Sequence, residues 1–239
     1  MKNPLYTHLI TSCSKGKNQL TPESPALCIS EGESHTSVLS RWLEQTQSSR
    51  NRTALRAIDT YRGTHWSIAK EIQCSTPNVE LWVISAGMGF LHSSDMIIPY
   101  EATFHQIPFS HVAWWQSLNE SFSIDRRASS ISNLMHSNPM DDYVIAGSPV
   151  YIKAVELDVQ KGLSALQNPG KQLTVITSKT YSGFLEPYLI RSHAGMLGEL
   201  KSNMVCLNIK LAQSLIAARM NSKNVETTAH FTGLFPATN

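Results

Sequence analysis

One type of segment occurs three times in this chain and limits how it can fold: a short apolar run followed directly by a turn of small and polar residues. The apolar runs contain many β-branched and aromatic residues, which is typical of buried strands. The three pairs are YTHLIT (6–11) with SCSKGK (12–17), LWVI (81–84) with SAGMG (85–89), and DYVIA (142–146) with GSPVY (147–151). Each polar turn therefore lies at the carboxyl end of a predicted strand.

The segments between these strands have apolar residues at helical spacing. Helices are predicted over residues 36–47, 53–61, 65–73, 110–122, 126–135, 148–166 and 205–220, a fourth strand over 173–177, and a loop-rich stretch over 181–200. Strands that alternate with helices predict an α/β fold. We expect a single three-layer domain over residues 1–239, with a mostly parallel or mixed central sheet flanked by helices and a helical insertion around 36–75.

The bulk composition is that of an ordinary globular chain, with 41% hydrophobic and 16% charged residues in 239. No apolar run approaches the roughly 20 residues that span a bilayer. The apolar segment near the N-terminus is too short for a secretory signal, so we expect a cytoplasmic protein without membrane contact. The four cysteines lie far apart and lack metal-ligand spacing, so neither a zinc site nor a disulfide is predicted, and no cofactor is expected.

The net charge of +2 is too small to indicate nucleic-acid binding by itself. Its distribution is more informative, because residues 41–70 and 171–223 are both basic. Together these segments could form one positive face. Each of them taken alone is also explained by solvated helix surfaces.

The first turn, Ser12–Lys17, has the chemistry of an anion site. Its hydroxyl groups and backbone N–H groups can donate hydrogen bonds, and Lys15 and Lys17 supply charge. Ser148 stands near a predicted helix N-terminus, where backbone amides can also hold an anion. Because parallel strands end at one edge of a sheet, the three turns are predicted to meet there. A plain surface loop remains the alternative for the first turn.

The order of these motifs resembles the YaaA-like family. The matching segments are SCSKGK, YRGTHW (61–66), ISAGMGFL, SDMIIPYEATF and AGSPVY, over roughly residues 8–155 and more loosely 175–216. The chain departs from the family pattern at Met88-Gly89-Phe90, where Tyr-Gly-Leu is commoner, and in having one lysine fewer in the first loop.

The resemblance implies a nucleic-acid-directed domain, related in architecture to the uracil-DNA-glycosylase-like folds. Some members look like DNA glycosylases of antiviral defence that act on modified bases of phage DNA, such as glucosylated hydroxymethylcytosine. YaaA itself is associated with DNA binding under oxidative stress. The resemblance therefore predicts a hydrolase that cleaves an N-glycosidic bond and leaves an abasic site.

Such a reaction needs a carboxylate that stabilises the cationic sugar or orients water. Asp95 is the first candidate, because it follows a strand in a polar loop and matches the Asp of the family; a structural turn residue is the alternative. Glu101 is the reserve. His92 could protonate the leaving base or bind phosphate.

A base inside a duplex must be flipped out of the stack, which calls for an aromatic wall in the pocket. Tyr100 is the main candidate for that wall. The predicted substrate-binding residues are Ser12, Cys13, Ser14, Lys15, Lys17, Gly87, Met88, Phe90, Tyr100, Ser148 and Tyr151. Two other function classes stay open: a non-catalytic DNA-binding protein, and a hydrolase of free nucleosides or nucleotides.

Overall fold

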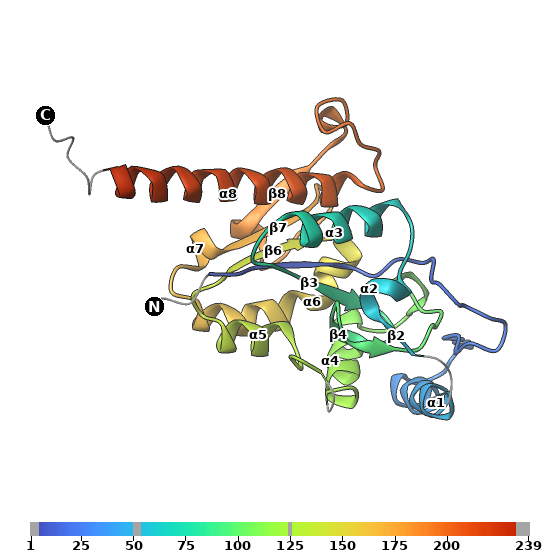
Figure 1. The fold of residues 1–239 in the computed structure, drawn as a ribbon. Coiled ribbons are helices and arrows are strands. Elements are labelled where there is room, and N and C mark those ends of the chain that lie inside the picture. The colour runs from blue at the N-terminus through green and yellow to red at the C-terminus, as the bar shows by residue number, and fades with distance from the viewer. Residues whose placement is uncertain (1–4, 50–53, 124–125, 233–239) are drawn as a thin grey trace, which may run out of the picture.

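The computed structural model describes residues 5–49, 54–123 and 126–232, and for residues 221–232 it describes the backbone alone. A six-stranded sheet forms its centre, in the order β4-β3-β1-β6-β7-β8 (Figure 1). Five of its strands are parallel: β1 (Thr7–Ser12), β3 (Val79–Ser85), β6 (Asp142–Ala146), β7 (Leu173–Ser178) and β8 (Leu189–Ser192). The edge strand β4 (Gly89–His92) is antiparallel to β3. The predicted α/β fold with a mostly parallel sheet is confirmed.

Helices cover both faces of this sheet, which gives the three predicted layers (Figure 1). On one face lie α3 (Thr64–Ser75) and α8 (Leu207–Thr232). On the other lie α4 (His111–Ser121), α5 (Ile131–Ser137) and α6 (Pro149–Gly162), with α1 (His35–Ser48) beside α4. The short elements are α2 (Ala57–Thr60), α7 (Pro169–Gln172), and the 3-10 turns η1 (Phe104–Gln106), η2 (Leu163–Ala165), η3 (Glu186–Tyr188) and η4 (Ala194–Met196).

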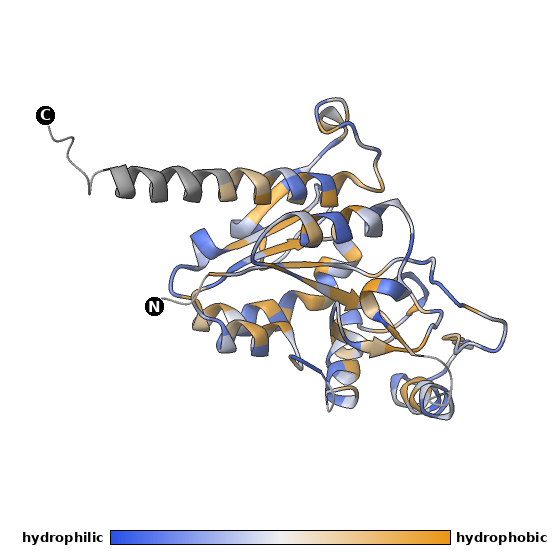
Figure 2. Cartoon of the chain, viewed as in Figure 1, coloured by the Kyte–Doolittle hydropathy of each residue, from blue (hydrophilic) through white to orange (hydrophobic). Residues whose placement is uncertain are grey.

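The core lies between the sheet and these two helical layers. The inner strands are apolar along their length because side chains on both sheet faces are buried, and Figure 2 shows them as mostly hydrophobic. Leu9, Ile10, Val83 and Ile145 are fully buried in them. Among the residues that the structure describes, no helix has both the length and the apolar character needed to cross a membrane.

Three segments differ from the predicted elements. Of the helix predicted over 53–61, the described residues 54–61 contain β2 (Leu55–Arg56) and the short α2 instead, because β2 pairs with β5 (Met96–Ile97). The helix predicted from 126 begins at Ile131, where the Ser130 side chain accepts a hydrogen bond from the Asn133 N–H. The stretch predicted to be loop-rich, 181–200, contains the edge strand β8. A helical insertion was predicted around 36–75; in that region α3 belongs to one of the two helical layers and packs on β3.

The stretch from β3 to β5 folds back on itself, which decides where the functional residues lie. After β3 the chain turns at residues 86–88 and returns as β4, with Ser85 opposite Gly89 and Trp82 opposite His92. Gly89 has a φ of 69°, a left-handed conformation that suits glycine. The return carries His92–Asp95 away from the edge where the parallel strands end.

Candidate functional site

A cavity of about 580 Å³ lies where β1 and β6 end, and we name it the edge cavity. It is built from four segments that are far apart in the sequence: the first loop, the start of α3, the turn after β6 and the start of α8. Its lining residues are Ser12, Cys13, Ser14, Lys15, Gly16, Arg62, Gly63, Thr64, His65, Gly147, Ser148, Asn203, Met204, Val205, Cys206 and Asn208. The predicted meeting of the first and third turns is therefore present in the structure.

The edge cavity has the chemistry of an anion site. Gly63 and Ser148 are the N-cap residues of α3 and α6, and α8 begins beside the cavity, so three positive helix ends point toward it. Lys15 and Arg62 are exposed cations on its wall. The buried Ser148 hydroxyl has no hydrogen-bond partner among the described residues, so it is free to bind a ligand oxygen.

His65 fixes one wall of the edge cavity. Its Nε2 lies 2.9 Å from the Thr11 hydroxyl, which donates to the Ala146 carbonyl at 2.7 Å. Its ring also lies beside the backbone of Val205. Burial lowers the pKa of His65 to about 4, so the imidazole is neutral at physiological pH. It therefore ties β1, α3 and the segment before α8 together without adding charge.

A second cavity, of about 630 Å³, adjoins the edge cavity at Lys15, which lines both. We name it the Glu101 cavity after the carboxylate on its wall. Its lining residues are Lys15, Lys17, Glu101, Ala102, Thr103, His105, Gln106 and Tyr151. The Tyr151 hydroxyl lies 3.6 Å from Cys13 Sγ, which connects the walls of the two cavities. Burial raises the pKa of Tyr151, so its phenol stays protonated and can donate a hydrogen bond.

Lys17 is the buried base of the first loop. Its ammonium group donates to the carbonyls of Ser14 (3.1 Å) and Lys15 (3.4 Å) and lies 4.5 Å from the centre of the Tyr100 ring. Burial lowers the pKa of Lys17. These contacts hold the loop in place; Lys17 is buried and also lines the Glu101 cavity, whereas Lys15 is exposed.

Four of the predicted binding residues lie in the core behind the site. Tyr100 is fully buried, and its hydroxyl bonds those of Tyr61 (2.8 Å) and Ser85 (2.5 Å). Phe90 stacks on Trp82 with ring centres 4.9 Å apart. Gly87 and Met88 are buried too. Among the described residues that line the two cavities, none of these four is present.

Asp95 and His92 lie apart from both cavities. The Asp95 carboxylate accepts a hydrogen bond from the His92 N–H at 2.8 Å and lies 3.8 Å from the Arg126 guanidinium. Burial raises the pKa of Asp95 and lowers that of His92 to about 4. Since Ser93 bonds the Leu81 carbonyl, this turn lies beside the amino half of β3. These contacts match the alternative of a structural turn, and they leave Glu101 as the predicted carboxylate that lines a cavity.

Several cavity residues were not predicted. Arg62, Gly63 and His65 belong to the YRGTHW segment, whose position at a helix start was the signal that could have identified them. Asn208 donates to the Gly147 carbonyl at 2.8 Å and so connects α8 to the third turn. Local sequence gave no sign of this contact, because the two residues meet only through the order of the strands.

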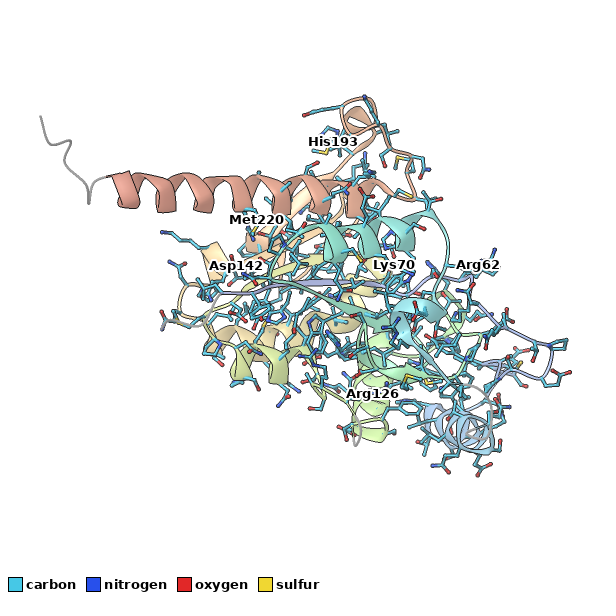
Figure 3. The ribbon with its side chains drawn as sticks, in the orientation of Figure 1. Arg62, Lys70, Arg126, Asp142, His193 and Met220 are labelled. Carbon is cyan, nitrogen blue, oxygen red and sulfur yellow. The ribbon has the colours of Figure 1, made fainter. Side chains whose placement is uncertain are left out.

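The two basic segments meet only in part: α3, which carries Lys70, packs against α8, whereas α1, which carries Arg41, lies on the other face of the sheet. Part of this charge is neutralised, since Lys70 lies 3.8 Å from Asp59 and Arg191 lies 3.7 Å from Glu186. Arg62 lies on the side where the parallel strands end, whereas Asp142 lies where β6 begins (Figure 3). Arg50, Arg52 and the side chain of Lys223 lie outside the described part of the chain.

Comparisons with known proteins identify no relative of this chain. No protein-family model matches the chain, and no curated protein or solved structure matches it.

Proposed function

We propose that the protein is a DNA glycosylase that hydrolyses the bond between a modified nucleobase and its deoxyribose and leaves an abasic site. The observation that supports this most directly is the contact between the two cavities at Lys15. One cavity offers helix N-termini, hydroxyls and cations to a phosphate, and the other offers a carboxylate to the neighbouring sugar. A nucleotide unit of DNA presents these two groups side by side.

In this proposal Glu101 takes the part first considered for Asp95. Its carboxylate stabilises the positive charge that develops on the sugar as the base leaves, and it orients the attacking water. The protonated phenol of Tyr151 faces the same cavity and can donate to the departing base. Ser12, Ser14, Lys15 and Ser148 hold the phosphate.

The resemblance to the YaaA-like family supports a role in antiviral defence, with modified phage DNA as the substrate. The walls of the Glu101 cavity favour a base that carries a polar substituent, because Thr103, His105 and Gln106 line it with hydrogen-bonding groups. Its volume of about 630 Å³ leaves space for such a substituent beside the base.

The test is the release of bases from phage DNAs that carry different modifications, measured by mass spectrometry together with the count of abasic sites. Glu101→Gln should lower base release by about 100-fold or more while DNA binding persists. Asp95→Asn is the matched control and should keep the activity of any protein that remains folded. Loss of activity in Asp95→Asn with full activity in Glu101→Gln would reverse the assignment. No base release from any DNA would overturn the glycosylase.

A hydrolase of free nucleotides is the second candidate. It is favoured by the net charge of +2, which is low for a DNA-binding protein, and by cavities of a size that suits one small ligand. Incubation of the protein with free nucleotides alongside polymeric DNA separates the two. A non-catalytic DNA-binding protein would bind the polymer and release no base from either substrate.

A further inference from the structure

We infer that the protein also cuts the DNA strand at the abasic site, with the Lys17 amine as the nucleophile that attacks C1′ of the opened sugar. This inference rests on the proposed function, which leaves an abasic deoxyribose beside Glu101. Such a sugar opens to an aldehyde at C1′, and a lysine amine condenses with an aldehyde to form an imine. The inference therefore adds a lyase step to base release.

The first observation is the position of Lys17. It lines the Glu101 cavity together with Glu101 and Tyr151, although it is only 5% exposed. Its backbone is held against the core, because Lys17 pairs with Tyr61 in an isolated β-bridge. An amine on a fixed backbone can meet a substrate carbon without first ordering a mobile loop.

The second observation is the set of hydrogen bonds that the amine makes. Lys17 Nζ lies 3.1 Å from the Ser14 carbonyl and 3.4 Å from the Lys15 carbonyl. These two carbonyls can accept both N–H groups of a neutral amine, which leaves its lone pair for attack on carbon. The bonds therefore suit the deprotonated form that a nucleophile requires.

The third observation concerns the charge of Lys17. The rings of Tyr100 and Tyr61, whose centres lie 4.5 and 5.7 Å from Nζ, favour the ammonium form. Burial acts against the ammonium and lowers the pKa of Lys17 below its ordinary value of 10.5, although Cys13 and Glu101 act in the opposite direction. Lys17 therefore gives up a proton to solvent more easily than a lysine in water does.

The proposed step is balanced and changes no oxidation state overall. The Nζ lone pair forms a bond to C1′, and the carbonyl oxygen leaves as water to give a protonated imine. Glu101 then takes a proton from C2′, the electron pair of that bond forms a double bond between C2′ and C3′, and the bond between C3′ and its oxygen breaks. The leaving group is the 5′-phosphate of the downstream fragment. Water hydrolyses the imine and returns the amine to Lys17.

The probe is a DNA duplex with one abasic site, prepared beforehand by a separate uracil-excising enzyme, so that the test does not depend on base release. Cyanoborohydride reduces an imine to a stable amine, and peptide mass spectrometry of the trapped protein identifies the lysine that carries the DNA. We expect the adduct on Lys17 and cleavage of the strand on the 3′ side of the abasic site. An adduct on Lys15 or any other lysine, or no adduct and no cleavage, would overturn the inference.

Lys17→Arg tests the same point by loss of function. Its guanidinium keeps the charge and the N–H donors for the two carbonyls but cannot form an imine, so adduct and strand cleavage should fall by about 100-fold or more. Lys171→Arg is the matched control and should match the unaltered protein, because Lys171 is exposed and lies in α7, just before the amino end of β7. Full strand cleavage by Lys17→Arg would contradict the inference. The mapped adduct comes from the unaltered protein, so the test stands even if the variant is unstable.

The lyase and the glycosylase fail separately. Base release from a modified DNA, without an adduct or strand cleavage on the abasic duplex, would reject the lyase and support the glycosylase. An adduct on Lys17 with strand cleavage, in a protein that releases no base from any DNA, would support the lyase and reject the glycosylase.

Discussion

The ammonium group of Lys17 lies 4.5 Å from the centre of the Tyr100 ring, which joins the first loop to the segment after β5. The same ring packs against Gly87, so one buried contact also connects both segments to the turn between β3 and β4. Three of the motifs noticed in the sequence thus form a single packed unit behind the two cavities. This unit makes the shape of the site sensitive to residues that touch no ligand.

Replacement of Lys17 by Met should destabilise the protein by about 1 to 3 kcal/mol, because the carbonyls of Ser14 and Lys15 would lose their donor inside the protein. Relief of the buried charge offsets part of this cost. The free energy of unfolding in urea measures it. Lys15→Met, at an exposed position, is the control and should change stability by less than about 0.5 kcal/mol. Equal losses of stability in the two variants would contradict the conclusion that Lys17 holds the first loop in place.

Replacement of Gly87 by Ala should cost about 1 to 3 kcal/mol through overpacking. A Cβ at this position would lie 2.6 Å from Tyr100 Cε2 and 3.0 Å from Trp42 Cζ2. Gly198→Ala is the matched control, since a Cβ there meets no described atom within 4 Å. Thermal unfolding compares them. A Gly87→Ala protein as stable as the Gly198→Ala protein would show that the Tyr100 contact is looser than described.

Replacement of Ser148 by Ala should leave stability unchanged within about 0.5 kcal/mol, since the buried hydroxyl has no partner among the described residues to lose. Affinity for a phosphate-bearing ligand should fall by about five- to tenfold, the usual worth of one hydrogen bond. Inorganic phosphate and DNA are both suitable probes in a titration. Unchanged affinity for both would remove Ser148 from the anion site.

Acid should destabilise the protein through His65, whose pKa falls from an ordinary value of 6.5 to about 4 on folding. Between these values the unfolded chain binds more protons than the folded one, so the free energy of unfolding falls as the pH falls. The loss from His65 is about 3 kcal/mol by pH 4.

The measurement is the free energy of unfolding against pH for the unaltered protein and for His65→Gln. His92 acts in the same direction, and His8, whose pKa is raised, acts in the opposite one, so the difference between the two curves isolates His65. Parallel curves between pH 4 and 6.5 would disprove its role.

Local sequence patterns predicted the α/β class, the first, third, sixth and seventh strands and the polar turns after β1 and β6. This succeeded because buried parallel strands are apolar along their length, and their ends need small or polar residues. The edge strand β8 was not predicted. Two of its four residues are only partly buried and one is exposed, so the strand lacks a continuous run of buried apolar side chains.

The sequence determined by itself that a turn with hydroxyls and lysines follows β1, that a turn with hydroxyls follows β6, and that Asp95 and Glu101 stand near each other along the chain. Only the tertiary structure showed which of those two carboxylates lines a cavity. The hairpin of β3 and β4 carries Asp95 back along the sheet, whereas Glu101 pairs with Ala26 and lines a cavity. The antiparallel direction of β4 places Asp95 away from the cavities. Strand direction depends on hydrogen bonds between segments that are distant in the sequence, so it cannot be predicted from the spacing of residues.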